Sequence, residues 1–119
     1  MAQDPQPGDF LVFQLESAVG LLRVLAIDET DHRKVWHLAA YGDFFPDVEA
    51  AESAINDQNP LSANLPHVAL TDRAFESTQV ARIAHAPLND EETEHVASWR
   101  QNDSREIHDR SIRLLLGLR

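Results

Sequence analysis

The chain has 119 residues, no cysteine and a formal net charge of −10. This length suits one domain with a single core, and a hydrophobic content of 43% is typical of a globular chain rather than a disordered one. Without cysteine, disulfide bonds and thiolate catalysis are excluded, and the acidic balance argues against direct binding to nucleic acid, whose phosphates it would repel.

The N-terminal segment, residues 1–6, is polar and contains proline, so we expect a flexible leader before the domain. It lacks the charged-then-apolar pattern of a signal peptide, and no apolar run in the chain approaches the roughly 18 residues that suggest a membrane span. We therefore expect a cytoplasmic protein that does not bind a membrane.

The most readable stretch is a pair of apolar runs, residues 10–16 and 20–27, which we interpret as a β-hairpin. Both runs are apolar on both faces, so the sequence predicts that other elements cover the second face of the sheet. Gly20 at the end of the connection indicates a positive φ or a bulge. Residues 34–41 are predicted to form a third strand, which gives an antiparallel meander.

A helix of about ten residues is predicted to begin near Pro46 and to lie on the sheet through Val48, Ala51 and Ile55. Residues 58–66 read as a loop. The pattern then predicts a short strand, a turn or single helical turn, and a further strand, at 67–71, 72–76 and 79–85.

Two helices are predicted in the C-terminal part. Asn89 and Glu92 have capping-box spacing at the start of the first, which continues to Arg100. The second should occupy 103–119, where apolar residues recur at helical spacing. We thus expect a single domain, residues 1–119, of the α+β class: a small antiparallel bent sheet or barrel with two to three helices packed on it.

Motifs for catalysis are missing from the sequence. The six histidines show no metal-ligand spacing, the serines lie in no nucleophile motif, and four isolated glycines cannot form a phosphate-binding loop. We therefore predict no catalytic residues, no metal site and no cofactor. A site assembled from distant histidines and carboxylates stays open, so a small hydrolase-type enzyme is kept as an alternative.

Charge is unevenly distributed along the chain. Residues 1–60 carry eleven Asp or Glu against three Lys or Arg, whereas residues 100–119 carry three against five. The acidic body favours a basic protein partner, and aromatic rings beside carboxylates could hold a basic side chain, although the same rings could instead fill the core. The predicted partner-binding residues are Asp28, Glu29, Asp31, Trp36, Tyr41, Asp43, Phe44 and Asp47.

A resemblance to a known family rests on the first hairpin. Pro7-Gly8-Asp9-Phe10-x-Val12-Phe13, followed by Gly20-Leu21-Leu22-Arg23-Val24-Leu25, resembles the opening hairpin of SH3-like barrels and is similar to that of small bacterial immunity proteins. It covers about a fifth of the chain. The resemblance implies an SH3-like sheet or barrel and a non-enzymatic protein that binds and neutralises a toxin. It assigns no functional residue.

The sequence favours a protein-binding module of this immunity or antitoxin type, and the alternative beside the enzyme is a small-ligand or peptide-binding domain that uses the aromatic and acidic edge. The basic, leucine-rich tail also suggests a homodimer, unless its helix is enclosed by its own sheet. The residues of that dimer interface would be Ile107, Leu114, Leu115 and Leu118.

Overall fold

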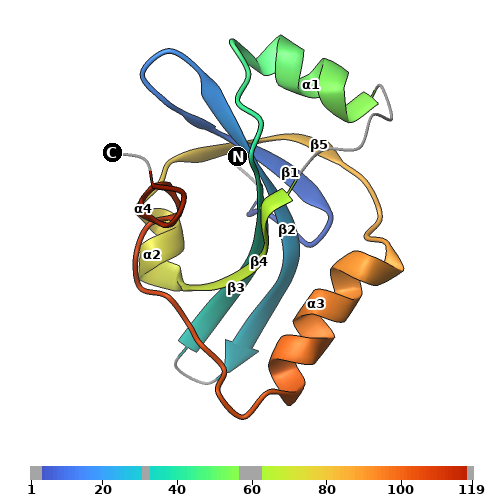
Figure 1. Cartoon of the computed structure of the whole chain (residues 1–119), viewed down its shortest axis with the longest axis vertical. Helices are drawn as coiled ribbons and strands as arrows, with labels where there is room; N and C mark the ends of the chain where they lie inside the picture. The colour runs from blue at the N-terminus through green and yellow to red at the C-terminus, as the bar shows by residue number, and fades with distance from the viewer. Residues whose placement is uncertain (1–3, 31–32, 57–62, 118–119) are drawn as a thin grey trace.

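The structure is a computed structural model that describes residues 4–30, 33–56 and 63–117. These residues form an α+β domain with five strands and four short helices (Figure 1). In chain order the elements are β1 (Asp9–Gln14), β2 (Val19–Thr30), β3 (Arg33–Tyr41), α1 (Val48–Asn56), β4 (Ala63–Thr71), α2 (Asp72–Glu76), β5 (Val80–His85), α3 (Asp90–Gln101) and α4 (Ile112–Leu115).

The five strands form one antiparallel sheet in the order β4-β3-β2-β1-β5. The first three strands form the predicted meander, β4 extends it beyond β3, and β5 returns to pair with β1. Irregular register in three of the four strand pairs accompanies the strong bend of the sheet, which curls around α2 and α4 in Figure 1.

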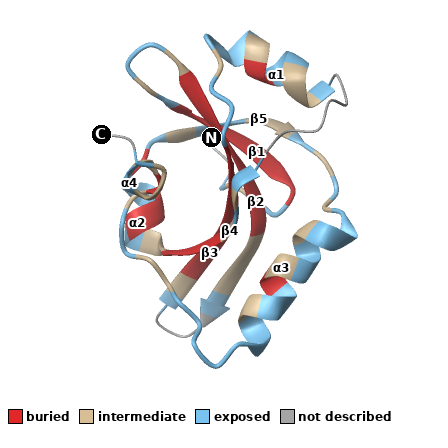
Figure 2. Cartoon of the chain, viewed as in Figure 1, coloured by how far each residue is buried: buried red, intermediate tan, exposed pale blue. Residues whose placement is uncertain are grey.

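Both faces of the sheet are covered, which confirms the interpretation of the apolar hairpin. The concave face carries the largest cluster of buried side chains, including Phe13, Val24 and Leu38, and α2 and α4 close it through Phe75 and Ile112. On the other face, α1 and α3 cover two smaller clusters. Figure 2 shows the result, with buried residues concentrated in the strands and the helices exposed on their outer sides.

The helices α1 and α3 lie where the sequence predicts them. In α1, Ala51 is buried, but Val48 is 37% exposed and does not share the inner face that we expected for it. At the start of α3 the predicted capping box is present: the amide of Glu92 donates to the Asn89 side chain at 2.8 Å, and the amide of Asn89 donates to Glu92 Oε1 at 2.9 Å.

The predicted helix over 103–119 is wrong. Helix α3 ends at Gln101, and the chain then runs without regular structure to a single turn, α4, capped by the Ser111 side chain. The physical reason is the open edge of β4, because the amide of His108 donates to Ala69 O at 2.8 Å and the amide of Thr71 donates to His108 O at 3.0 Å. An extended segment can satisfy that edge, whereas a helix has no free backbone groups for it.

Three further details differ from the sequence-based expectation. Gly20 lies inside β2 and is needed because the ring of Phe13 occupies the space where its Cβ would be, whereas Gly8 and Gly117 are the glycines that have a positive φ. In the leader, residues 1–3 lie outside the described part, but Gln6 is held by a turn, since its amide donates to the Asp9 carboxylate at 2.8 Å. Strand β4 also begins at residue 63, inside the predicted loop.

The two-sided sheet makes a sharp prediction about Val24, which has no exposed surface. Val24→Asp should lower the free energy of unfolding by roughly 4 kcal/mol or more, because it buries a charge with no partner. Urea denaturation followed by circular dichroism would measure this. Ala81→Asp, on the exposed side of β5, is the matched control and should change stability little. Similar stabilities for the two variants would contradict the two-sided core.

Candidate functional site

A chain of three polar side chains crosses the face of the sheet beneath α3. His37 on β3 is completely buried, and its Nε2 lies 3.0 Å from Asp28 Oδ2 on the neighbouring strand β2. On the other side, His37 Nδ1 lies 2.9 Å from His67 Nε2 on β4. The three residues therefore form a continuous hydrogen-bonded relay from β2 to β4, which we call the histidine relay.

The hydrogen bonds of the relay define which nitrogen atoms carry protons when both rings are neutral. An ionised Asp28 only accepts, so the proton between it and His37 sits on His37 Nε2. His37 Nδ1 then accepts, and His67 Nε2 must donate to it. This leaves His67 Nδ1 unprotonated, as the atom of the relay that can accept a proton from outside.

Helix α3 covers the relay. The indole of Trp99 meets His37 edge-on at a ring distance of 4.6 Å, and the Arg100 guanidinium is bonded to the Asp28 carboxylate. Trp99 lines two cavities, one of about 420 Å³ that His67 also lines and one of about 480 Å³ that Asp28 also lines. His67 is thus the relay's most accessible histidine, since His37 is enclosed.

Burial sets the protonation states of the relay. Desolvation lowers the pKa of His67 to about 4, and the neighbouring rings of His37 and His95 act in the same direction. Desolvation also lowers the pKa of His37, against the opposing effect of Asp28. The bond from Arg100 holds the pKa of Asp28 below its usual value. At neutral pH the relay therefore consists of two neutral imidazoles and one carboxylate.

Chemically, this arrangement can hold and accept a proton. Perturbed histidines at a cavity are a feature of catalytic sites. A nucleophilic side chain bonded to the relay is missing from the described residues, however, and the same part of the chain contains no group of three side chains that could hold a metal ion. The contacts of the relay make it a buried polar connection between three strands and α3.

The eight predicted partner-binding residues do not form one surface. Trp36 and Tyr41 are buried on opposite faces of the sheet, Trp36 stacked on Phe75 and Tyr41 in the cluster under α1, and burial raises the pKa of Tyr41 to about 12. Their predicted exposure to a partner is wrong because both rings fill the core. Asp28 belongs to the relay, and Glu29 lies beside Lys34 at 3.8 Å. Asp31 lies outside the described residues.

The remaining three, Asp43, Phe44 and Asp47, are all exposed in the connection from β3 to α1, at the opposite end of β3 from Glu29. The backbone of Phe45 pairs with Val19 through hydrogen bonds of 2.7 and 3.0 Å, which fixes this connection against β2. The ring of Phe45 packs inward, whereas Phe44 remains 44% exposed. We call the surface formed with the first half of the helix the α1 face; it consists of Asp43, Phe44, Asp47, Val48, Glu49 and Glu52.

The residues predicted for a dimer interface are also separated. Leu115 packs against the main core, Ile107 is half-buried beside the second cavity, and Leu114 is 59% exposed. Leu118 lies outside the described residues. Because 103–111 is not helical, the apolar stripe on which the homodimer prediction depended is not formed.

Sequence reasoning missed the relay because its members lie on three different strands, with His67 thirty residues from His37. The only local signal was His37, a titratable residue within the apolar strand 34–41. The register that pairs β2 with β3, and β3 with β4, is what brings Asp28 and His67 to it. That register depends on irregularities in the strands, which a sequence pattern does not reveal.

Comparison of the chain with protein-family models, with curated proteins and with solved structures found no match in any of the three. The longest helix that the structure describes, α3, has twelve residues, and none of the described helices has the length and apolar character needed to cross a membrane.

The relay predicts a loss of stability in acid. The unfolded chain binds a proton at the histidine's ordinary pKa of 6.5, whereas folded His67 binds it only near 4. Between these values the unfolded state holds more protons, so the free energy of unfolding should fall as the pH drops from about 6.5 toward 4, by on the order of 2 kcal/mol for this partly exposed group. Urea titrations at successive pH values would measure it.

His67→Gln should remove most of this acid sensitivity, because glutamine does not titrate. His95→Gln on α3 is the matched control: it removes a histidine that makes only the smallest of the three contributions to the lowered pKa of His67, so it should keep most of the wild-type fall in stability. A His67→Gln variant with the wild-type fall in stability would show that other groups cause the pH dependence.

Proposed function

We propose that this chain is a cytoplasmic, non-enzymatic protein-binding module of the immunity or antitoxin type, and that the α1 face binds a basic protein partner. The observation that carries the proposal is the combination on one surface of two exposed apolar side chains, Phe44 at 44% and Val48 at 37%, with four exposed carboxylates. A fixed apolar residue surrounded by charge is the arrangement of an interface anchor with a polar rim.

Rigidity of the α1 face supports this assignment. Phe44 lies between the paired residue Phe45 and the end of β3, and the carboxylate of Asp47 accepts a hydrogen bond from the Ala50 amide at 2.8 Å. The surface is therefore held in place before a partner arrives, which reduces the entropy that binding must overcome. The carboxylates would speed the approach of a basic protein and set its orientation.

The topology is consistent with the SH3-like part of the proposal. A meander whose fifth strand returns to the first, with a helical turn between the fourth and fifth strands, is compatible with an SH3-like sheet. A pocket built from the predicted aromatic edge has less support, because Trp36 and Tyr41 are buried.

Capture experiments with variants of the chain test the proposal. Immobilised wild-type protein should retain at least one basic protein from extracts of the source cells, and added salt should weaken that retention. Phe44→Ser and Glu52→Lys should each reduce recovery of the same protein by roughly tenfold, the equivalent of 1.4 kcal/mol. Quantitative mass spectrometry would measure recovery.

Glu94→Lys is the matched control, since it makes the same charge change on the exposed side of α3. Its recovery of the partner should equal that of the wild type. The proposal fails if every captured protein is retained equally by the Phe44→Ser, Glu52→Lys and Glu94→Lys forms.

A further inference from the structure

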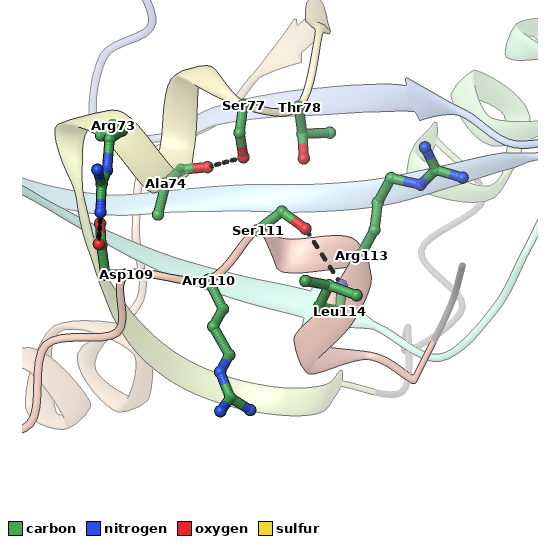
Figure 3. Close-up of a pocket in the computed structure, with 9 residues that line it drawn as sticks. All are labelled: Arg73, Ala74, Ser77, Thr78, Asp109, Arg110, Ser111, Arg113 and Leu114. Carbon is green, nitrogen blue, oxygen red and sulfur yellow. Dashed lines mark hydrogen bonds and ion pairs between the residues drawn. The ribbon is translucent and has the colours of Figure 1, made fainter.

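A pocket of about 510 Å³ lies between α2 and α4, on the face of the molecule opposite α1 (Figure 3). The chain shapes it through two short helical turns that meet over the concave core. Ile112 of α4 is buried in that core, and Phe75 of α2 is buried beside it. Both walls of the pocket are therefore anchored by apolar burial.

The charge of the pocket is opposite to that of the protein as a whole. Three arginines and one aspartate line it, in a chain whose net charge is −10. Arg73 is bonded to the Asp109 carboxylate, and Thr71 donates to the same carboxylate at 2.6 Å. Arg110 and Arg113 add two further positive charges, so the lining residues together carry +2. A concentration of arginine of this kind attracts anions.

The pocket lining also contains hydroxyl groups, which are uncharged hydrogen-bond donors. The Ser77 hydroxyl donates to Ala74 O at 2.6 Å, so it is already engaged. Thr78 differs: only 7% of it is exposed, and its hydroxyl has no hydrogen-bond partner among the described residues. Thr78 follows the end of α2. In Figure 3 its hydroxyl points toward α4, the helix that carries Arg113. A buried hydroxyl without a partner is costly for the empty protein, and an acceptor at the base of the pocket would satisfy it.

We propose that this pocket binds a small organic phosphate monoester. A phosphate monoester carries a charge of −1.5 to about −2 at neutral pH, which suits a lining that contains three arginines, and guanidinium groups bind phosphate oxygens in pairs. Exposed Arg110 is free to swing toward such an anion, and the Thr78 hydroxyl would donate to one of its oxygens. The organic part of the ligand would lie on Ala74 and Leu114, the latter 59% exposed at the rim.

This site does not depend on the proposed function, because it is built from other elements on the other face of the sheet. Isothermal titration calorimetry at constant ionic strength tests it with three probes: phenyl phosphate, inorganic phosphate and benzoate. Phenyl phosphate should bind with a Kd of about 1 mM or tighter. Inorganic phosphate lacks the apolar part and benzoate lacks the second charge, so both should bind at least about tenfold more weakly, a difference of 1.4 kcal/mol.

Two variants connect binding to the pocket. Arg110→Gln, on the surface, should weaken phenyl phosphate about tenfold and leave the melting temperature unchanged. Thr78→Val should weaken binding and raise the melting temperature of the ligand-free protein, since it removes the unpartnered hydroxyl at nearly constant shape. Arg82→Gln on β5 is the matched control for charge and should bind like the wild type.

The proposal would be overturned by the absence of phenyl phosphate binding at millimolar concentration, or by equal loss of affinity in Arg110→Gln and Arg82→Gln. Equal affinity for inorganic phosphate and phenyl phosphate would overturn the assignment of an organic ligand. A lowered melting temperature for Thr78→Val would contradict the role given to its hydroxyl, and Arg110→Gln would still test the charge.

Discussion

The arrangement of this domain depends on one buried cation. Arg23 lies in the middle of β2 with only 3% of its surface exposed, and its guanidinium donates to Gly8 O at 2.5 Å, to Pro87 O at 3.0 Å and to the Glu92 carboxylate at 3.0 Å. These three acceptors belong to the entry of β1, the connection after β5 and the first turn of α3. A charge buried here is stable only while all of them stay in place, because loss of a partner from a buried pair costs about 3–5 kcal/mol.

Through Arg23 the capping of α3 is joined to the sheet. Glu92 accepts from Arg23 and also from the amide of Asn89, so the same carboxylate closes the capping box and neutralises the buried charge. With its first turn held there, α3 lies so that Trp99 and Arg100, near its other end, cover the histidine relay. The position of the relay's cover is therefore set by a contact about two helical turns away.

Most strands and two helices could be predicted from the sequence because local patterns determine them: apolar runs, the Asn89 capping box and Pro46 just before a helix, which begins at Val48 and not at the proline. The segment after Gln101 could not, since its apolar spacing is helical while the competing bonds, from His108 to the edge of β4, are made with residues some 38 positions away. The same limit applies to the sites. Burial of Trp36 follows from the face that it occupies in the bent sheet, and exposure of Phe44 follows from the course of the connection between β3 and α1. Thr78 lines one pocket with the arginines because Ile112 docks α4 on the core beside α2.

Separation of charge between the two faces gives the proposed functions a common physical basis. Carboxylates gather on the α1 face, whereas the arginines of the α2–α4 pocket lie behind the sheet. A basic protein would be attracted to the first surface and repelled from the second, so the orientation of the complex would be set before contact. A small phosphate would be attracted to the pocket and repelled from the α1 face. Since the concave core separates the two surfaces, each ligand could bind without displacing the other, and an energetic coupling between them would have to pass through the packed sheet.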